Sequence, residues 1–116
     1  MPLYLGQVAY TPEAWQALVR NPQDRFDAVR PAIENLGGKL VSAWFSFGEY
    51  DVIAVMDMPG NVAAASIAMA FVAGGACKSV KTTPLLTTAE ALEALRAAAT
   101  CGYRPATAAA AAASSA

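Results

Sequence analysis

The sequence predicts an α+β domain in which the elements follow the order β-α-β-β-α-β, with one further helix toward the C-terminus. Three observations carry this prediction. Two stretches of strand-like residues flank the short segment Gly48-Glu49, as the arms of a hairpin do. Capping residues precede three segments whose apolar residues have helical spacing. One strand pattern comes before the first of these helices, and another comes after the second. A chain of 116 residues can bury roughly two thirds of its unfolded surface in one core.

The first strand is expected from Leu3 to Tyr10, with the first helix directly after it. Thr11 is a favourable helix N-cap, and Pro12 fits the first helical position because its missing N–H would have no partner there. Asn21-Pro22 repeats this pair, so the helix is expected to break there and restart. Gly37-Gly38 is expected to end the restarted helix.

The central hairpin is expected to have strands at about Lys39–Phe47 and Tyr50–Met58, joined by Gly48-Glu49 as a type II′ turn. In this register one face is apolar and should meet the helices; it holds Val41, Ala43, Phe45, Phe47, Tyr50, Val52, Ala54 and Met56. The other face is mixed and holds Leu40, Ser42, Trp44, Ser46, Asp51, Ile53, Val55 and Asp57.

A charge-free helix and an edge strand follow the hairpin. The stretch from Val62 to Cys77 contains no charged residue, so its helix, capped by Gly60 or Asn61, should be covered on more than one side. A fourth strand is expected over Cys77–Thr83, and the proline that follows it favours an edge position.

The C-terminal part is expected to be simple. Thr87 and Glu90 have the spacing of a capping box and predict a third helix. We expect one domain over residues 1–100 and a flexible, alanine-rich tail over residues 101–116, because the tail has nothing to bury.

The composition points to an interface and away from nucleic acid. The chain is 56% hydrophobic and only 15% charged, and its mean hydropathy is +0.36. A small globule cannot hide this much apolar surface alone, so part of it is expected in a homodimer or a multiple of dimers. The net charge of −1, with no basic stripe, speaks against nucleic-acid binding.

Metal, cofactor and membrane sites are not expected. The chain has no histidine, which removes the commonest metal ligand and the commonest general acid or base at neutral pH. Cys77 and Cys101 are too few for a zinc cluster and are expected to be reduced thiols. The charge-free stretch is shorter than the roughly 20 residues that span a bilayer, and no signal peptide is apparent, so a cytoplasmic location is expected.

This order of elements is that of a ferredoxin-like fold, in which two crossover helices cover one face of an antiparallel sheet. The mixed face is then uncovered, although Trp44, Ile53 and Val55 are too apolar to be left in water. Two sheets that pair face to face across a dyad remove this exposure. The expected assembly is therefore a dimeric α/β barrel.

A short motif in the hairpin carries a resemblance to a known family. The segment from Phe47 to Val52 contains Gly-x-Tyr-Asp, and Met58-Pro59, Ala68-Met69-Ala70 and the stretch from Val80 to Leu85 extend the likeness. Over roughly residues 3 to 95 the chain resembles the GYD domain family of small bacterial proteins. The resemblance implies a dimeric α/β-barrel-like fold and leaves the activity open.

Five residues are candidates for ligand binding: Trp44, Ser42, Asp51, Lys81 and Tyr50. Trp44 is expected either to form a flat pocket wall or to anchor a subunit interface. Lys81 is expected on the mixed face with Val80 toward the core, and either binds an anion or simply protects an edge strand. Asp51 either fixes the turn or acts as a base, and Tyr50 either packs across from Phe47 or contacts ligand. Arg20, Arg25 and Arg30 are expected on the solvated side of the first helix.

Three functions remain open at this point. The first is a non-catalytic binder of a small metabolite in a barrel or interface pocket. The second is an interaction module that docks through the charge-free helix. The third is a cofactor-independent enzyme acting on a quinone-like or enolisable substrate, with Asp51 as the base.

Overall fold

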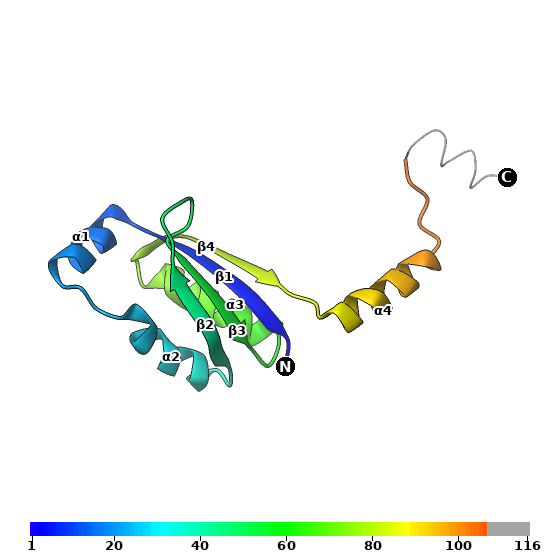
Figure 1. Ribbon diagram of the computed structural model, residues 1–116, viewed down its shortest axis with the longest axis horizontal. Helices are drawn as coiled ribbons and strands as arrows, with labels where there is room; N and C mark the ends of the chain where they lie inside the picture. The colour runs from blue at the N-terminus through cyan, green and yellow to red at the C-terminus, as the bar shows by residue number, and fades with distance from the viewer. Residues whose placement is uncertain (107–116) are drawn as a thin grey trace. The chain divides into compact units, whose positions relative to one another are not determined.

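The computed structural model describes residues 1–106, which Figure 1 colours from blue at the N-terminus to orange. Contacts divide the chain into two compact units, Met1–Leu85 and Leu86–Ala116. The first unit contains the whole sheet and three helices, and the second contains α4 (Thr88–Ala99). Most of the predicted tail, residues 107–116, lies outside the described residues.

The sheet has four antiparallel strands in the order β2-β3-β1-β4. Their bounds are β1 (Leu3–Tyr10), β2 (Lys39–Phe45), β3 (Val52–Asp57) and β4 (Cys77–Pro84). This is the strand order of a ferredoxin-like fold, so the predicted α+β class and order of elements are confirmed. As expected, β1 is central and β4 lies at an edge.

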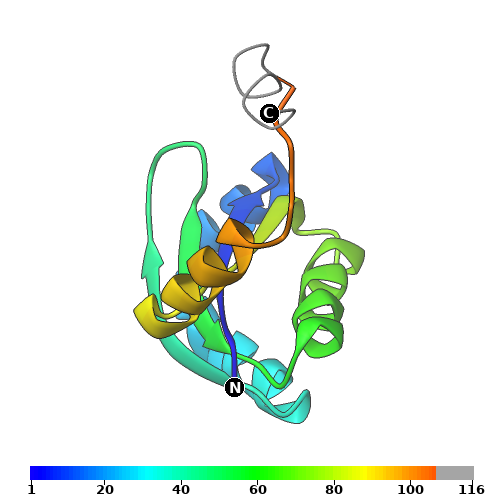
Figure 2. The same cartoon turned by 90° about the vertical axis from the view of Figure 1, so that its right-hand side faces the viewer.

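Three helices belong to the first unit: α1 (Pro12–Arg20), α2 (Arg25–Asn35) and α3 (Asn61–Ala73). All three contribute side chains to one side of the sheet, and Figure 2 shows α3 in green beside it. Tyr4 and Met56 from the sheet pack with Ile33 of α2 and Ile67 of α3 in the main buried cluster. The Tyr4 hydroxyl donates a hydrogen bond of 2.7 Å to Asn61 Oδ1, which satisfies its polar end.

The first crossover begins as predicted but restarts later. Thr11 caps α1, and its Oγ1 accepts a hydrogen bond of 3.1 Å from the Ala14 N–H. The predicted break at Asn21-Pro22 is confirmed: α1 ends at Arg20, and the Asn21 N–H donates to the Ala17 carbonyl. The restart directly after this pair was wrong, because α2 begins only at Arg25, where the carboxylate of Asp24 caps it.

The hairpin register is confirmed over four pairs and wrong at both ends. Ser42, Ala43, Trp44 and Phe45 lie opposite Val55, Ala54, Ile53 and Val52. The strands stop at Phe45 and start again at Val52, and Gly48 does not have the positive φ of a type II′ turn. Instead the loop is closed by Ser46, whose N–H and Oγ donate to the carbonyls of Asp51 and Tyr50 at 2.8 and 2.6 Å.

A register shift in β2 exchanges two residues between the faces. The pairing slips between Leu40 and Ser42, so Leu40 lies opposite Met56 rather than Asp57. Leu40 packs against the buried cluster, while Val41 is 51% exposed. The predictions that Leu40 belongs to the mixed face and Val41 to the apolar face were both wrong, because a bulge inserts one residue into the alternation.

The sheet therefore has two different faces. The helix face carries Tyr4, Gly6, Val8, Leu40, Ala43, Phe45, Val52, Ala54, Met56 and Val80. The open face carries Leu5, Gln7, Ser42, Trp44, Ile53, Val55, Lys81 and Thr83. Within Met1–Leu85 the helices α1, α2 and α3 all pack on the helix face.

The second unit begins with the predicted capping box. Thr87 Oγ1 accepts from the Glu90 N–H at 3.1 Å, and Glu90 Oε1 accepts from the Thr87 N–H at 2.9 Å. These reciprocal bonds fix the start of α4 at Thr88. Among residues 1–106, no helix has the length and apolar character needed to cross a bilayer.

Candidate functional site

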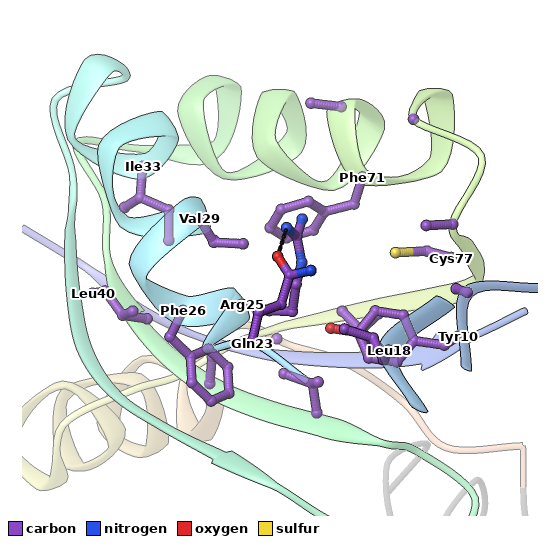
Figure 3. Close-up of a pocket in the computed structure, with 18 of the residues that line it drawn as sticks. Tyr10, Leu18, Gln23, Arg25, Phe26, Val29, Ile33, Leu40, Phe71 and Cys77 are labelled. Carbon is purple, nitrogen blue, oxygen red and sulfur yellow. Dashed lines mark hydrogen bonds between the residues drawn. The ribbon is translucent and has the colours of Figure 1, made fainter. Parts of the chain in front are cut away.

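A cavity of about 390 Å³ lies between the helix face of the sheet and the three helices of the first unit. Figure 3 shows α2 and α3 above it and the strands below. Its volume falls within the range of about 300–1,000 Å³ that is usual for small-molecule sites. One chain forms this cavity, which is partly open to solvent because lining residues such as Ala17, Gln23 and Ala70 are exposed.

Small residues make this space. Gly6 and Ala54 lie directly opposite each other on β1 and β3 and line the space, although Met56 Cε covers Gly6 so closely that an added Cβ would lie 3.0 Å from it. Ala17 of α1 and Ala70 of α3 line the same space. Larger side chains at the three alanines would reduce this space, and empty space loses dispersion contacts. The cavity thus follows from small residues brought together by the fold.

The rest of the wall is mostly apolar. Val29 and Ile33 contribute from α2, Phe71 from α3, and Leu40 and Val52 from the sheet. Figure 3 shows Phe71 reaching from α3 into the cavity, opposite the strands. A site with such a wall favours an apolar body in its ligand.

Polar groups gather at one end, where Tyr10, Gln23, Arg25 and Cys77 line the cavity. Arg25 is half-buried at the start of α2, and its Nη1 donates a hydrogen bond of 3.2 Å to Gln23 Oε1. Figure 3 shows the Arg25 side chain extending from α2 into the space between Phe71 and Tyr10. Arg25 is the charged residue among those that line the cavity.

Burial keeps the other two titratable groups neutral. It raises the pKa of the Tyr10 hydroxyl; the Cys77 sulfur adds to the rise, and the Arg25 charge opposes it. Burial also raises the pKa of the Cys77 thiol, again against the effect of Arg25. At neutral pH this end of the cavity therefore combines one positive charge with a neutral phenol and a neutral thiol.

Three of the five predicted site residues lie elsewhere, on the open face. Trp44 and Ser42 stand opposite Ile53 and Val55, and Lys81 stands opposite Gln7 on β1. Trp44 is 58% exposed. These three residues share one surface of the sheet, as expected, on the side away from the cavity.

Asp51 does not join them. Its Oδ2 accepts hydrogen bonds from the Tyr10 N–H at 2.9 Å and from Trp15 Nε1 at 3.3 Å. The Tyr10 and Trp15 rings meet edge to face, with centroids 5.4 Å apart. The prediction that Asp51 lies on the mixed face was wrong, because Asp51 lies in the loop between β2 and β3 and its carboxylate joins that loop to β1 and α1.

Tyr50 also sits in this loop. Its carbonyl accepts the hydroxyl of Ser46, and its side chain is half-buried. The expected partner, Phe47, is fully exposed at the loop tip, so the two aromatic rings do not form the predicted cross-strand pair. The reason is again that the strands end before this point.

The sequence interpretation missed the cavity residues. Arg20, Arg25 and Arg30 were all expected on the solvated side; Arg20 and Arg30 are exposed, but the prediction was wrong for Arg25, which lines the cavity. One signal was available: Arg25, Val29 and Ile33 recur every four residues, which places them on one stripe of α2. Arg30 lies off this stripe and forms an exposed ion pair of 2.9 Å with Asp27.

Fold and cavity together define a small ferredoxin-like protein with a partly open, largely apolar cavity. The GYD domain model matches residues 4–95, which is most of the chain. The chain therefore belongs to the GYD domain family, as the hairpin motif indicated. Neither the curated proteins nor the solved structures contain a match to it.

Proposed function

We propose that this protein binds a small, largely apolar molecule in the cavity between its sheet and its helices. The observation that carries the proposal is the cavity of about 390 Å³, which Ala17, Ala54 and Ala70 leave unfilled and whose wall is mostly apolar. Empty apolar space costs stability, and a bound apolar molecule would recover the lost contacts. The proposed pocket differs from the expected barrel or interface pocket because a single chain forms it.

Binding is favoured over catalysis by the chemistry of the wall. The lining side chains described within residues 1–106 include no carboxylate and no imidazole. The raised pKa values of Tyr10 and Cys77 make both groups poor bases at neutral pH. Asp51, the base required by the alternative enzyme hypothesis, already accepts two hydrogen bonds that hold the loop.

Native mass spectrometry of the protein as purified tests this function. We expect a reproducible adduct on the wild type and its loss in Ala54→Leu, because the added side chain occupies cavity space. Ala65→Leu adds the same side chain at an exposed site on α3 and should keep the adduct. An adduct that persists in Ala54→Leu would contradict the proposal, as would a wild type that carries none and does not bind 1-octanol.

A homodimer formed through the open face is a second proposal, supported by a separate observation. Trp44, Ile53 and Val55 form an apolar strip that no helix of Met1–Leu85 covers. A second copy laid across this face would bury the strip.

The interaction-module hypothesis keeps one supporting feature. Val62, Met69 and Val72 of the charge-free helix α3 are exposed in the subunit. Docking through this helix would change assembly without changing the cavity, so the adduct test separates it from the binding function.

A further inference from the structure

We infer that the ligand of this cavity is an organic monoanion, with a carboxylate that lies against Arg25 and an apolar body that fills the rest. The inference rests on the proposed function and specifies its ligand class. It depends on the charge balance and on the distribution of polar groups along the cavity.

Among the described residues, Arg25 has no counter-ion. The ion pair within residues 1–106 joins Arg30 to Asp27, and the side chain of Arg25 hydrogen-bonds to the neutral amide of Gln23. Arg25 is half-buried and lines an apolar cavity, where a guanidinium is less well solvated than at the surface. An incoming carboxylate would restore the balance through paired N–H···O bonds.

The neighbouring groups fit an acceptor rather than a donor in the ligand. Tyr10 and Cys77 are both protonated at neutral pH, and each has a hydrogen to donate. The charge of Arg25 acts on both groups, so all three lie within electrostatic reach of one another. A carboxylate placed among them would meet a guanidinium, a phenol and a thiol. The charge of Asp51 also acts on Tyr10, but the Asp51 carboxylate does not line the cavity and accepts hydrogen bonds from the Tyr10 N–H and Trp15 Nε1.

The single positive charge also limits the charge of the ligand. A phosphate monoester carries nearly two negative charges at neutral pH, and one of them would stay unpaired beside Val29, Ile33 and Phe71. A carboxylate matches Arg25 one to one. The apolar wall then accepts an aliphatic or aromatic body.

A structural role for Arg25 is the competing explanation. Its aliphatic stem could simply cover apolar surface while the guanidinium reaches water. That role depends on the stem and predicts no preference between charged and neutral ligands. The two explanations therefore differ in ligand selectivity, which can be measured.

Isothermal titration with octanoate and with 1-octanol at pH 7 provides this measurement. For the wild type we expect octanoate to bind about tenfold or more tightly than 1-octanol, as one well-placed charged hydrogen bond allows. Arg25→Gln should bring the two affinities to within about twofold, leaving 1-octanol unaffected. Arg30→Gln, on the same helix, is the matched control and should keep the preference. Arg25→Lys should keep part of it, because the charge remains.

The outcomes separate the inference from the function on which it rests. If 1-octanol and octanoate bind the wild type equally, or if folded Arg25→Gln keeps the preference, the carboxylate inference is wrong and the apolar cavity function stands. If neither probe binds the wild type, the proposed function fails and the inference fails with it. Thermal unfolding followed by circular dichroism establishes that each variant is folded.

Discussion

The helix face and the open face of the same sheet differ in the size of the side chains at their centres. On the helix face the central pair, Gly6 opposite Ala54, is small and lines the cavity. On the open face Leu5 lies opposite Val55, and the neighbouring Ile53 lies opposite Trp44 of β2. The side that helices already cover is thus underfilled, whereas the uncovered side is crowded with large apolar residues. This arrangement suits a ligand inside and a protein surface outside.

The largest expected effect is on stability, and it distinguishes the two faces through neighbouring residues of β3. Met56→Ala, on the helix face, should lower the free energy of unfolding by about 2–5 kcal/mol because it empties a buried site. Val55→Ala, on the open face, should cost about 1 kcal/mol or less in a dilute monomer. Urea unfolding at two protein concentrations measures both.

The concentration dependence sharpens this comparison. If the open face is an interface, the cost of Val55→Ala should grow with protein concentration, because dimer formation adds to stability. The cost of Met56→Ala should not change with concentration. Equal costs for the two variants in dilute solution would remove the distinction between the faces.

The next effect concerns assembly. Trp44→Glu places a charge on the open face and should weaken a dimer by about thirtyfold or more, the loss typical of a central aromatic anchor. Phe47→Glu introduces the same charge at the loop tip, where Phe47 is 101% exposed, and should leave assembly unchanged. Light scattering coupled to size exclusion reports the mass. A wild type that is monomeric at high concentration would contradict the dimer proposal.

A smaller effect on stability is expected in the loop between β2 and β3. Asp51→Asn should lower the free energy of unfolding by about 1 kcal/mol, because hydrogen bonds to Tyr10 and Trp15 lose their charge. For a domain of this size that corresponds to a fall in Tm of about 4–8 °C. Glu49→Gln removes a charge from the same loop without these bonds and serves as the control. No change in Tm for Asp51→Asn would show that the carboxylate does not hold the loop.

The smallest effect tests the polar end of the cavity. Burial raises the pKa of Cys77 above its ordinary 9.0, so its alkylation by iodoacetamide should stay slow up to that pH and accelerate above it. Arg25 opposes this rise, so Arg25→Gln should raise the pKa further and slow alkylation at pH 8 by a factor of about two to ten. Arg30→Gln should not change the rate. Faster alkylation in Arg25→Gln would contradict the proximity of the two groups.

The sequence was sufficient for the elements whose signals are local. The caps at Thr11 and Thr87, the central register around Trp44 and Ile53, and the full extent of β1 were all predicted. Each depends on residues within a few positions of one another, where capping and alternation act directly.

Features that depend on distant residues could not be predicted. The bulge at Val41 changes the face of Leu40 without any glycine or proline to mark it. The cavity arises because Gly6, Ala54 and Ala70 meet in space, although each is an ordinary small residue in its own segment. The sequence correctly grouped three candidate residues on one face of the sheet: Ser42, Trp44 and Lys81. Only the fold could show that the cavity lies on the other face.

The bulge in β2 also bears on how copies of this chain could grow into larger assemblies. β2 is an edge strand, and an edge with regular hydrogen-bonding groups can recruit strand after strand without limit. The shift at Val41 breaks the regular row on that edge, and Pro84 ends the row on β4 at the other. Open-ended polymerisation along the sheet is thereby discouraged. Any association of copies is then expected to give closed complexes with a fixed number of chains.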